Sequence, residues 1–429
     1  MSNAAAAAQR IITRCRELAR ISDVPGQTTR LFLSPATREA HALVGGWMRE
    51  AGLRAWTDAV GNLRGIRGAE DAPRLVFGSH LDTVINAGAF DGPLGVLMGI
   101  ELAHAAAAET LPFAVEVIGF SEEEGVRFAK PFLGSLAAVG GLDDAILESS
   151  DKAGVTVRQA LREFGLDGGA IADAQLSPRT FGYLEFHIEQ GPVLDDERTS
   201  IAVVHAVAGQ TRMQVRFRGQ ANHAGTTPMG RLRRDAVAAA AEWIVEVERY
   251  ANVCAGLVAT VGKVEVPGGA GNVIAGDCEA TLDVRHAQDE VRRDAVRHMM
   301  NAAERAGAAR AVSVESSTTL QQPAVAMDEL LMAAVEDACG RTGCSRAQRM
   351  TSGAGHDAMI IARKVPAAMV FLRSPAALSH HPEESVILGD VEAAYFAGLE
   401  LLCMLRDDRA MLDRLVARAS RCKGEVRDA

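Results

Sequence analysis

Residues 75–95 read LVFGSHLDTVINAGAFDGPLG, a strand-like run that ends at a histidine and continues into a glycine-rich turn with two aspartates. The run RLVFGSH (74–80) predicts a short buried strand, and LGVLMGIELAHAAAAE (94–109) predicts the helix that follows it. The next stretch, PFAVEVIGF (112–120), has the composition of a second strand. Because strands alternate with helices here, we expect an α/β sheet with helices on both faces.

The middle of the chain has a different pattern, which predicts a second domain. In TRMQVRFRG (211–219), Met213, Val215 and Phe217 alternate with polar residues, as in a strand with one exposed face. The order β-α-β-β-α-β predicts a small ferredoxin-like unit, one sheet covered by two helices. The further elements expected in it are a helix at 233–251, strands at 257–266 and 278–286, a helix at 289–307 and a strand at 309–317.

The α/β pattern resumes after about residue 327, with a helix at 327–340, a strand at 367–372 and a helix at 391–405. The chain of 429 residues is long enough for two domains that each bury a core. We therefore expect a discontinuous domain formed by residues 1–210 and 327–429, with an inserted domain at 211–326.

Composition and charge limit the class of partner. Hydrophobic residues make up 48% and charged residues 23% of the chain, as in ordinary globular proteins. The formal net charge of −10 argues against nucleic acid, because no basic surface is available to neutralise phosphates. The short run RLRRDA (231–236) is interpreted as a solvated helix start. No apolar run approaches the roughly 18–20 residues that span a bilayer, so we expect no membrane partner.

The cysteines and the N-terminus predict a cytoplasmic protein. The first residues, MSNAAAAAQRIITRCREL, have alanines where a signal peptide needs a basic region followed by a leucine-rich one. An odd, scattered set of cysteines without CxxC spacing predicts reduced thiols in the cytoplasm. The seven cysteines stand at positions 15, 254, 278, 339, 344, 403 and 422.

Four separated stretches each place metal-type ligands at a strand end or turn. Ligand sites in open α/β sheets gather at the carboxyl ends of the strands. Imidazole and carboxylate without thiolate suit Zn²⁺ or Mn²⁺, and a bridging carboxylate allows two ions about 3.5–4 Å apart. The stretches are GSHLDTV…AFDG with His80, Asp82 and Asp91, SEEEGVRF with Glu122, Glu123 and Glu124, FHIEQGP with His187, Glu189 and Gln190, and LSHHPEE with His380 and His381.

Each stretch also has a structural interpretation. A histidine after a strand often caps the strand or fills a core, and acids favour the first turn of a helix. The tetrapeptide SHHP is compatible with a simple turn. Four such stretches at predicted strand ends or turns favour a divalent metal site over four separate structural roles.

Several motifs together resemble a known family. HLDTV…FDG, EEEGxRF, FHIEQGPVLD, GQANHAGTTPM and GAGHDA are similar to the amidase/hydantoinase/carbamoylase branch of the M20 dinuclear metallohydrolases. That branch contains N-carbamoyl-L-amino-acid hydrolases, β-ureidopropionases and allantoate amidohydrolases. The resemblance spans about residues 75–385. It implies a zinc-peptidase-like catalytic domain with a mixed sheet flanked by helices, and makes the inserted domain a lid and dimerisation domain.

The resemblance implies a site with two divalent ions per subunit. Asp82 would accept the second ring N–H of His80, and Glu123 would be the general base. Zn²⁺ is the first choice of metal, and Mn²⁺, Co²⁺ and Ni²⁺ are the alternatives. The implied ligands are His80 and His187 on one ion, Glu124 and His380 on the other, and Asp91 on both.

The resemblance also implies contacts with substrate by Gln190, His223, Asn272 and Arg285. A guanidinium forks onto a carboxylate, so Arg285 implies an acid at the non-reacting end of the substrate. Its alternative role is that of a surface arginine at the end of the strand LDVR. His223 would donate to the oxyanion of the tetrahedral intermediate. That histidine comes from a partner subunit in many relatives, so the resemblance implies a homodimer.

The implied function is metal-dependent hydrolysis of a linear amide or ureido C–N bond in a small carboxylate-bearing substrate, an N-carbamoyl-L-amino acid or allantoate. The alternatives are an M20-type dipeptidase or aminoacylase on the same scaffold and a metal-binding relative without catalysis. His381 rivals His380 as the last ligand, and the sequence gives His356 and Asp357 no role.

Overall fold

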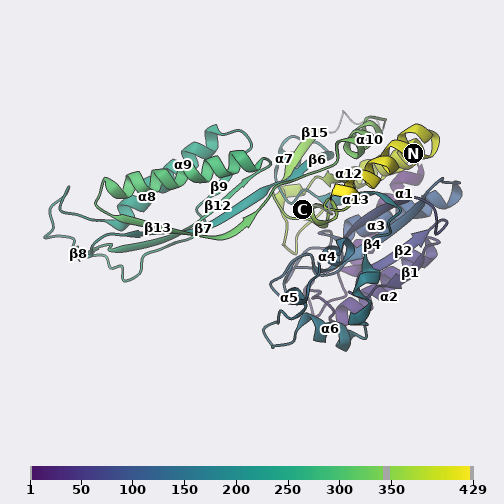
Figure 1. The fold of residues 1–429 in the computed structure, drawn as a ribbon, viewed down its shortest axis with the longest axis horizontal. Coiled ribbons are helices and arrows are strands. Elements are labelled where there is room, and N and C mark those ends of the chain that lie inside the picture. The colour runs from purple at the N-terminus through teal and green to yellow at the C-terminus, as the bar shows by residue number, and fades with distance from the viewer. Residues whose placement is uncertain (1, 342–347, 426–429) are drawn as a thin grey trace. The chain divides into compact units, whose positions relative to one another are not determined.

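The structure, a computed structural model, describes residues 2–341 and 348–425 and divides into two compact units (Figure 1). The first unit comprises Met1–His205 and Met327–Ala429, and the second comprises Ala206–Ala326. The sequence pattern predicts the first border after residue 210 and the second after residue 326. The first border between the two units therefore lies five residues earlier than expected.

The first unit contains a mixed sheet whose central strands are parallel. Strand β3 (Arg74–His80) lies between β4 (Ala114–Phe120) and β5 (Thr180–Ile188), parallel to both, and β16 (Ala367–Leu372) runs parallel to β5 on its other side. All the other pairings are antiparallel where the register is given. The strand order is β1 (Arg54–Thr57), β2 (Leu63–Arg67), β4, β3, β5, β16, β6 (Ile201–Val207), β14 (Val325–Ala326), and β15 (Gln348–Ser352) pairs with β6.

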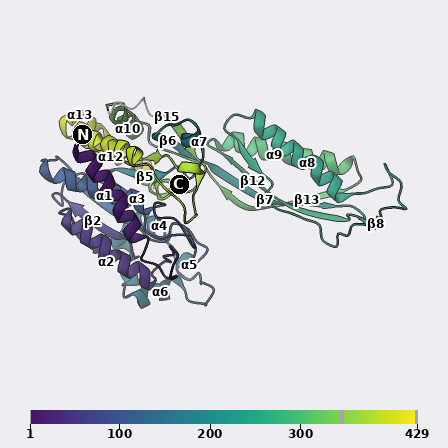
Figure 2. The same cartoon turned by 180° about the vertical axis from the view of Figure 1, so that it is seen from behind.

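Helices cover this sheet, as the alternating pattern predicts. Helix α3 (Pro93–Ala105) starts directly after the Asp91 turn and is buried along nearly its whole length. It packs against β3, and α1 (Ser2–Leu18) and α12 (Leu388–Asp407) lie beside it (Figure 2). The remaining helices of the unit are α2 (Pro35–Glu50), η1 (Ala106–Ala108), α4 (Leu133–Val139), α5 (Asp144–Leu147), α6 (Val157–Phe164), η2 (Gly168–Ala174), α7 (Val193–Asp196), α10 (Glu329–Arg341), α11 (Asp357–Ile361), η3 (Pro375–Ala377) and α13 (Arg409–Glu425).

The second unit contains a five-stranded antiparallel sheet with two helices packed on one face, and a separate two-stranded antiparallel sheet. In β7 (Gly209–Arg218), Met213, Val215 and Phe217 are buried and the residues between them are more exposed, as the alternation predicts. Phe217 contacts Trp243 of helix α8, with ring centroids 5.6 Å apart. The elements are β7, β8 (Asn222–His223), α8 (Ala236–Val253), β9 (Val258–Thr260), β10 (Val264–Glu265), β11 (Val273–Ile274), β12 (Asp277–His286), α9 (Asp289–Ala308) and β13 (Ser313–Gln322).

Three expected elements of this unit differ in the structure. The strand expected at 257–266 is two short strands, β9 and β10, which both pair with β12. The strand expected at 309–317 begins only at Ser313, because α9 continues to Ala308 and Ala311 adopts φ of 53° in the turn that follows. The helix expected at 233–251, with the run 231–236 as its solvated start, begins only at Ala236 and extends to Val253, and its first turn is capped by the side chain of Asp235.

No helix among the described residues is long and apolar enough to cross a membrane. Three cysteines of the described chain are buried, Cys15, Cys278 and Cys339, and three are partly buried, Cys254, Cys403 and Cys422. None of these six forms a disulfide bond within the described part of the chain. Cys344 lies outside the described residues.

Candidate metal centre

The opening stretch of the sequence brings a histidine and an aspartate to the same point of the fold. His80 is the last residue of β3, and Asp91 lies in the turn just before α3. Gly92, between Asp91 and that helix, has φ of 81°, and a Cβ atom on it would lie 2.5 Å from the His80 ring. Glycine is therefore needed at position 92 both for the backbone conformation and for the close approach of the imidazole.

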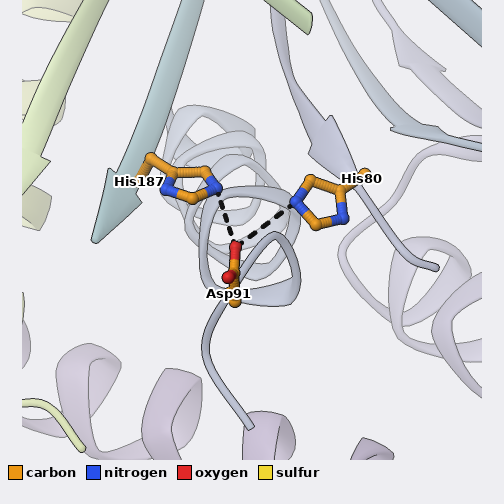
Figure 3. Close-up of side chains that lie close together, drawn as sticks. All are labelled: His80, Asp91 and His187. Atoms are coloured by element: carbon orange, nitrogen blue, oxygen red, sulfur yellow. Dashed lines mark ion pairs between the residues drawn. The ribbon is translucent and has the colours of Figure 1, made fainter. Parts of the chain in front are cut away.

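Asp91 meets two histidines from neighbouring parallel strands (Figure 3). Its Oδ1 lies 3.5 Å from Nε2 of His80 and 3.2 Å from Nε2 of His187, the penultimate residue of β5. The three side chains are almost fully buried. Asp91 Oδ1 and His187 Nε2 nevertheless have no hydrogen-bond partner within the described chain. Buried polar atoms without such a partner are candidates for binding a cation.

The Nδ1 atoms of His80 and His187 are hydrogen-bonded to backbone carbonyl oxygens. Nδ1 of His80 lies 3.0 Å from the carbonyl oxygen of Asp82, and Nδ1 of His187 lies 2.9 Å from that of Ile188. A ring N–H at Nδ1 leaves the lone pair on Nε2, so both Nε2 atoms are acceptors directed at the same space. Buried imidazole and carboxylate donors of this kind fit a divalent ion such as Zn²⁺ or Mn²⁺.

A second group of ligand atoms shares Asp91. Oδ2 of Asp91 lies 3.3 Å from Nε2 of His380, which in turn lies 3.5 Å from Oε1 of Glu124. Potential ligand atoms of these three residues fall within 4.8 Å of one another, as do those of His80, Asp91 and His187. The two oxygens of Asp91 thus face two separate groups, and this arrangement fits a carboxylate that bridges two ions.

The structure distinguishes which of the two rival histidines and which of the three adjacent glutamates lie at the cluster. His381 is exposed, and its Nδ1 accepts the backbone N–H of Glu383 rather than facing Asp91. Glu122 accepts the backbone N–H groups of Arg127 and Phe128 at 2.8 and 3.2 Å, which stabilises the following turn. His380 is therefore the histidine, and Glu123 and Glu124 are the glutamates, that lie at the cluster.

Asp82 contacts the site differently from the arrangement the resemblance implies. Its carboxylate lies 3.7 Å from Nδ1 of His80, whose closer partner is the Asp82 carbonyl. The carboxylate oxygens instead accept the backbone N–H groups of Glu123 and Glu124, each at 3.1 Å. Asp82 therefore connects the loop after β3 to the loop after β4, where both glutamates lie.

Burial and neighbouring charges shift the acids of this site in opposite directions. Burial raises the pKa of Glu123 well above its usual value, and the charges of Glu124 and Asp357 add to the effect while His80 opposes it. Burial, with the charge of Asp91, likewise raises the pKa of Glu124 to about 7. Burial also disfavours the Asp91 carboxylate, but the three histidines around it favour its charged form and bring its pKa well below the usual value.

Gln190 and Ser379 contact the same carboxylate as the histidines. The amide nitrogen of Gln190 donates to Oδ2 of Asp91 at 2.9 Å, and the Ser379 hydroxyl donates to that oxygen at 3.3 Å. The amide oxygen of Gln190 is buried without a hydrogen-bond partner among the described residues. The backbone of Gln190 has φ of 59°, an unfavourable conformation for a residue with a side chain. Such a conformation persists only where the surrounding contacts maintain it, and here it places the Gln190 side chain at the cluster.

The other three expected substrate contacts belong to the second unit. His223 in β8 pairs with Val273 in β11, and the neighbouring Ala224 donates its backbone N–H to the carbonyl of Asn272 at 2.9 Å. Nδ1 of His223 accepts the backbone N–H of Gly225 at 3.1 Å, so its Nε2 carries the proton in the neutral ring. His223 and Asn272 are thus side by side.

Arg285 lies on β12 and is already paired with a carboxylate of its own strand. Its Nε and Nη2 atoms donate to the two oxygens of Asp283 at 2.9 Å each. The same Asp283 carboxylate also accepts a hydrogen bond from Arg212 at 2.9 Å. A substrate carboxylate that binds Arg285 has therefore to share the guanidinium with Asp283 or displace it.

Several buried groups beside the cluster were not predicted as site residues. Glu185, two residues before His187 on β5, accepts hydrogen bonds from Ser79, Tyr183 and the backbone of Ala358. The ring of His356 packs edge-on against His187, with centroids 4.5 Å apart. Glu384, in the LSHHPEE stretch, contacts the backbone of the Asp91 turn. The available signal for Glu185 was its place in the largely apolar run of β5, because a glutamate in a fully buried strand has to be paired.

The chain is similar to proteins of one enzyme family over most of its length. The family model described as Peptidase family M20/M25/M40 matches residues 76–404. The chain is 39% identical over 451 residues to a probable allantoate deiminase of Oryza sativa subsp. japonica, which covers 95% of this chain and 90% of that protein. It is 37% identical over 382 residues to an N-carbamoyl-L-amino acid amidohydrolase of Geobacillus stearothermophilus, which covers 88% and 93%.

A solved structure gives the same result. An amidase of the hydantoinase/carbamoylase family from Burkholderia multivorans superimposes with a TM-score of 0.87 at 31% identity, covering 94% of this chain and 98% of that one. The mixed sheet, with buried imidazoles and carboxylates at the ends of its parallel strands, defines an α/β metal-dependent hydrolase. The chain belongs to peptidase family M20/M25/M40, and the resemblance read from its motifs is confirmed.

Proposed function

We propose that this protein hydrolyses the ureido or amide C–N bond of a small carboxylate-bearing substrate, an N-carbamoyl-L-amino acid or allantoate. The observation that carries the proposal is the buried Asp91, which faces His80 and His187 with one oxygen and His380 with the other. The names of the similar plant and bacterial proteins support a ureido acid as the substrate class. The motifs FHIEQGP and NHAGTTP disfavour the dipeptidase alternative.

Two groups of ligands in this chain fit two divalent ions, as the resemblance to the M20 family implies. His80 and His187 would hold one ion, Glu124 and His380 the other, and Asp91 would contact both. When bound, such ions polarise the carbonyl group and lower the pKa of a water molecule toward neutrality. Zn²⁺ is the first candidate for this nitrogen and oxygen set, and Mn²⁺, Co²⁺ and Ni²⁺ are the alternatives.

Glu123 is the general base in this proposal. Its neighbour Glu124 lies among the ligand atoms, and Asp82 fixes the backbone of both residues. Burial raises the pKa of Glu123, which makes its carboxylate a stronger base; it can accept a proton from the attacking water and, once protonated, pass that proton to the leaving nitrogen. Consecutive glutamates can divide the roles of base and ligand because their side chains point in different directions.

Residues of the second unit act on the substrate rather than on the metals. His223, protonated at Nε2, donates to the oxyanion of the tetrahedral intermediate. Arg285, with Asn272 and Gln190, binds the carboxylate end. We propose that the second unit is a lid and dimerisation domain that supplies these groups within a homodimer. Light scattering at micromolar concentration tests the dimer, and a monomeric active enzyme would contradict it.

Ammonia release tests the proposed function directly. The purified chain is loaded separately with Zn²⁺, Mn²⁺, Co²⁺ and Ni²⁺ and assayed with several N-carbamoyl-L-amino acids, β-ureidopropionate and allantoate. Dipeptides and N-acyl amino acids are assayed in parallel for release of free amino acid. Ammonia from a ureido acid supports the proposal. Cleavage of dipeptides alone would favour the peptidase alternative, and no turnover with any metal would favour a non-catalytic metal-binding protein.

A further inference from the structure

Glu384 is a buried carboxylate that joins two ligand-bearing segments of the metal centre. It follows His380 by four residues, and only 5% of it is exposed. Its Oε1 atom accepts the backbone N–H of Phe90 at 2.8 Å and that of Asp91 at 3.0 Å. The segment that carries His380 is thereby hydrogen-bonded to the turn that carries the shared Asp91 carboxylate.

The sequence of the turn leaves room for this contact. A Cβ atom on Gly88 would lie 2.3 Å from Cβ of Glu384 and 2.6 Å from its Oε1. Gly88 does not have the positive φ that by itself favours glycine. The absence of a side chain at position 88 is therefore explained by the approach of Glu384 rather than by backbone strain.

Only one oxygen of Glu384 makes the connection. Oε2 is buried and has no hydrogen-bond partner among the residues that the structure describes. A carbonyl oxygen at the place of Oε1 would accept the same two backbone hydrogen bonds. Glutamine can consequently replace Glu384 in this contact, whereas an apolar side chain of similar length cannot.

We propose that Glu384 is a positioning residue of the metal centre, which fixes the backbone of Asp91 so that its two oxygens face the His80–His187 pair and His380 together. The proposal rests on the two-ion site of the proposed function. Because Asp91 Oδ1 and Oδ2 face different histidines, a shift of the turn misplaces a ligand of both ions at once. Loss of a group that orients metal ligands typically lowers metal affinity by roughly 10–100-fold.

Three variants separate positioning from general stabilisation. Glu384→Met fills the space without an acceptor, Glu384→Gln keeps the acceptor, and Glu383→Gln alters the exposed neighbour as a matched control. Metal affinity is measured by dialysis against graded free Zn²⁺ and Mn²⁺, with the melting temperature of metal-free and loaded protein as a second measurement. We expect Glu384→Met to weaken metal binding by about 10–100-fold, and the other two variants to stay within about threefold of the wild type.

The outcomes distinguish this inference from the proposed function. If wild-type protein binds two ions and Glu384→Met binds them with equal affinity, the inference is overturned while the proposed function stands. If Glu384→Met only lowers the melting temperature of the metal-free protein and leaves its metal affinity unchanged, Glu384 is structural and the inference is also overturned. A wild-type protein that binds no ion overturns both.

A second variant keeps the test decisive if Glu384→Met does not fold. Gly88→Ala retains the acceptor on Glu384 but forces the turn and the carboxylate apart. Weaker metal binding by folded Gly88→Ala supports the positioning role, and unchanged binding overturns it.

Discussion

The carboxylate of Asp82 accepts a hydrogen bond of 3.1 Å from the backbone N–H of Glu123. Its other oxygen accepts the backbone N–H of Glu124 at the same distance. A single buried side chain thus holds the backbone of both the proposed base and a proposed ligand. Hydrogen bonds to a charged acceptor contribute about 1.5–3 kcal/mol each, so this contact is strong enough to set where both glutamates lie.

The first prediction follows from this contact. In Asp82→Asn the amide nitrogen faces one of the two backbone N–H groups, so one hydrogen bond is lost and two donors are brought together. We expect kcat to fall by about 10–100-fold with KM within about threefold, because the groups that move act on the water rather than on the substrate. Steady-state kinetics with the ureido acid that proves active measures this. The exposed Asp71→Asn is the matched control, and an unchanged kcat for Asp82→Asn would count against the positioning of Glu123.

The second prediction separates two adjacent acids. Glu123→Gln removes the proposed base and keeps its volume, and we expect kcat to fall by roughly 10²–10⁴-fold with two metal ions still bound. Glu122→Gln keeps an oxygen that accepts from Arg127 and Phe128, so we expect its kcat within about threefold of the wild type. Turnover rates and metal content of the two variants are measured together. The assignment of the base fails if Glu123→Gln remains active.

The third prediction concerns the substrate carboxylate. Arg285→Ala removes a charged two-bond contact worth on the order of 1.5–3 kcal/mol, so we expect kcat/KM to fall by about 10–150-fold. Arg285→Lys should recover little of the loss, because an ammonium group does not form the two parallel hydrogen bonds. Kinetics with a ureido acid and with its uncharged amide analogue identify the contact. A change of less than about threefold for Arg285→Ala would contradict the contact with the substrate carboxylate and leave Arg285, which pairs with Asp283, a structural role.

Much of the fold was predictable because the period of the hydrophobic residues is a local property. The alternation of Met213, Val215 and Phe217 predicts the buried face of β7, and the run 367–372 coincides with β16. The errors fall where tertiary contacts or turns override local pattern. The apolar run 257–266 is broken between β9 and β10, and the backbone at Ala311 has to turn before β13 can begin.

The candidate site was predictable as a set of residues but not as a set of contacts. His80, Asp91, His187 and His380 converge because parallel strands end at one edge of the sheet, and strand ends can be read from sequence. Which atom of Asp82 contacts His80 depends on side-chain rotation, which no sequence pattern specifies. The contact of Glu384 with Phe90 joins residues 294 positions apart, so it becomes visible only in the folded chain.

The last prediction concerns stability below neutral pH. His41 in α2 is buried against Phe164, and burial, with the charges of Arg38 and Arg30, lowers its pKa to about 4. The unfolded chain binds a proton at this residue near pH 6.5, whereas the folded chain does not until about pH 4. Protonation of His41 therefore does not change the free energy of unfolding above pH 6.5. It lowers the free energy of unfolding by about 3 kcal/mol in total as the pH drops from 6.5 to 4.

A neutral replacement at position 41 tests this linkage. We expect the free energy of unfolding of the wild type to fall by about 2 kcal/mol more than that of His41→Gln between pH 7.5 and pH 5, since His41→Gln cannot take up the proton. Urea unfolding followed by tryptophan fluorescence at the two pH values gives the difference. His104→Gln, which changes an exposed histidine, should follow the wild type. Equal losses for the wild type and His41→Gln would show that other groups, and not His41, determine the acid sensitivity of the first unit.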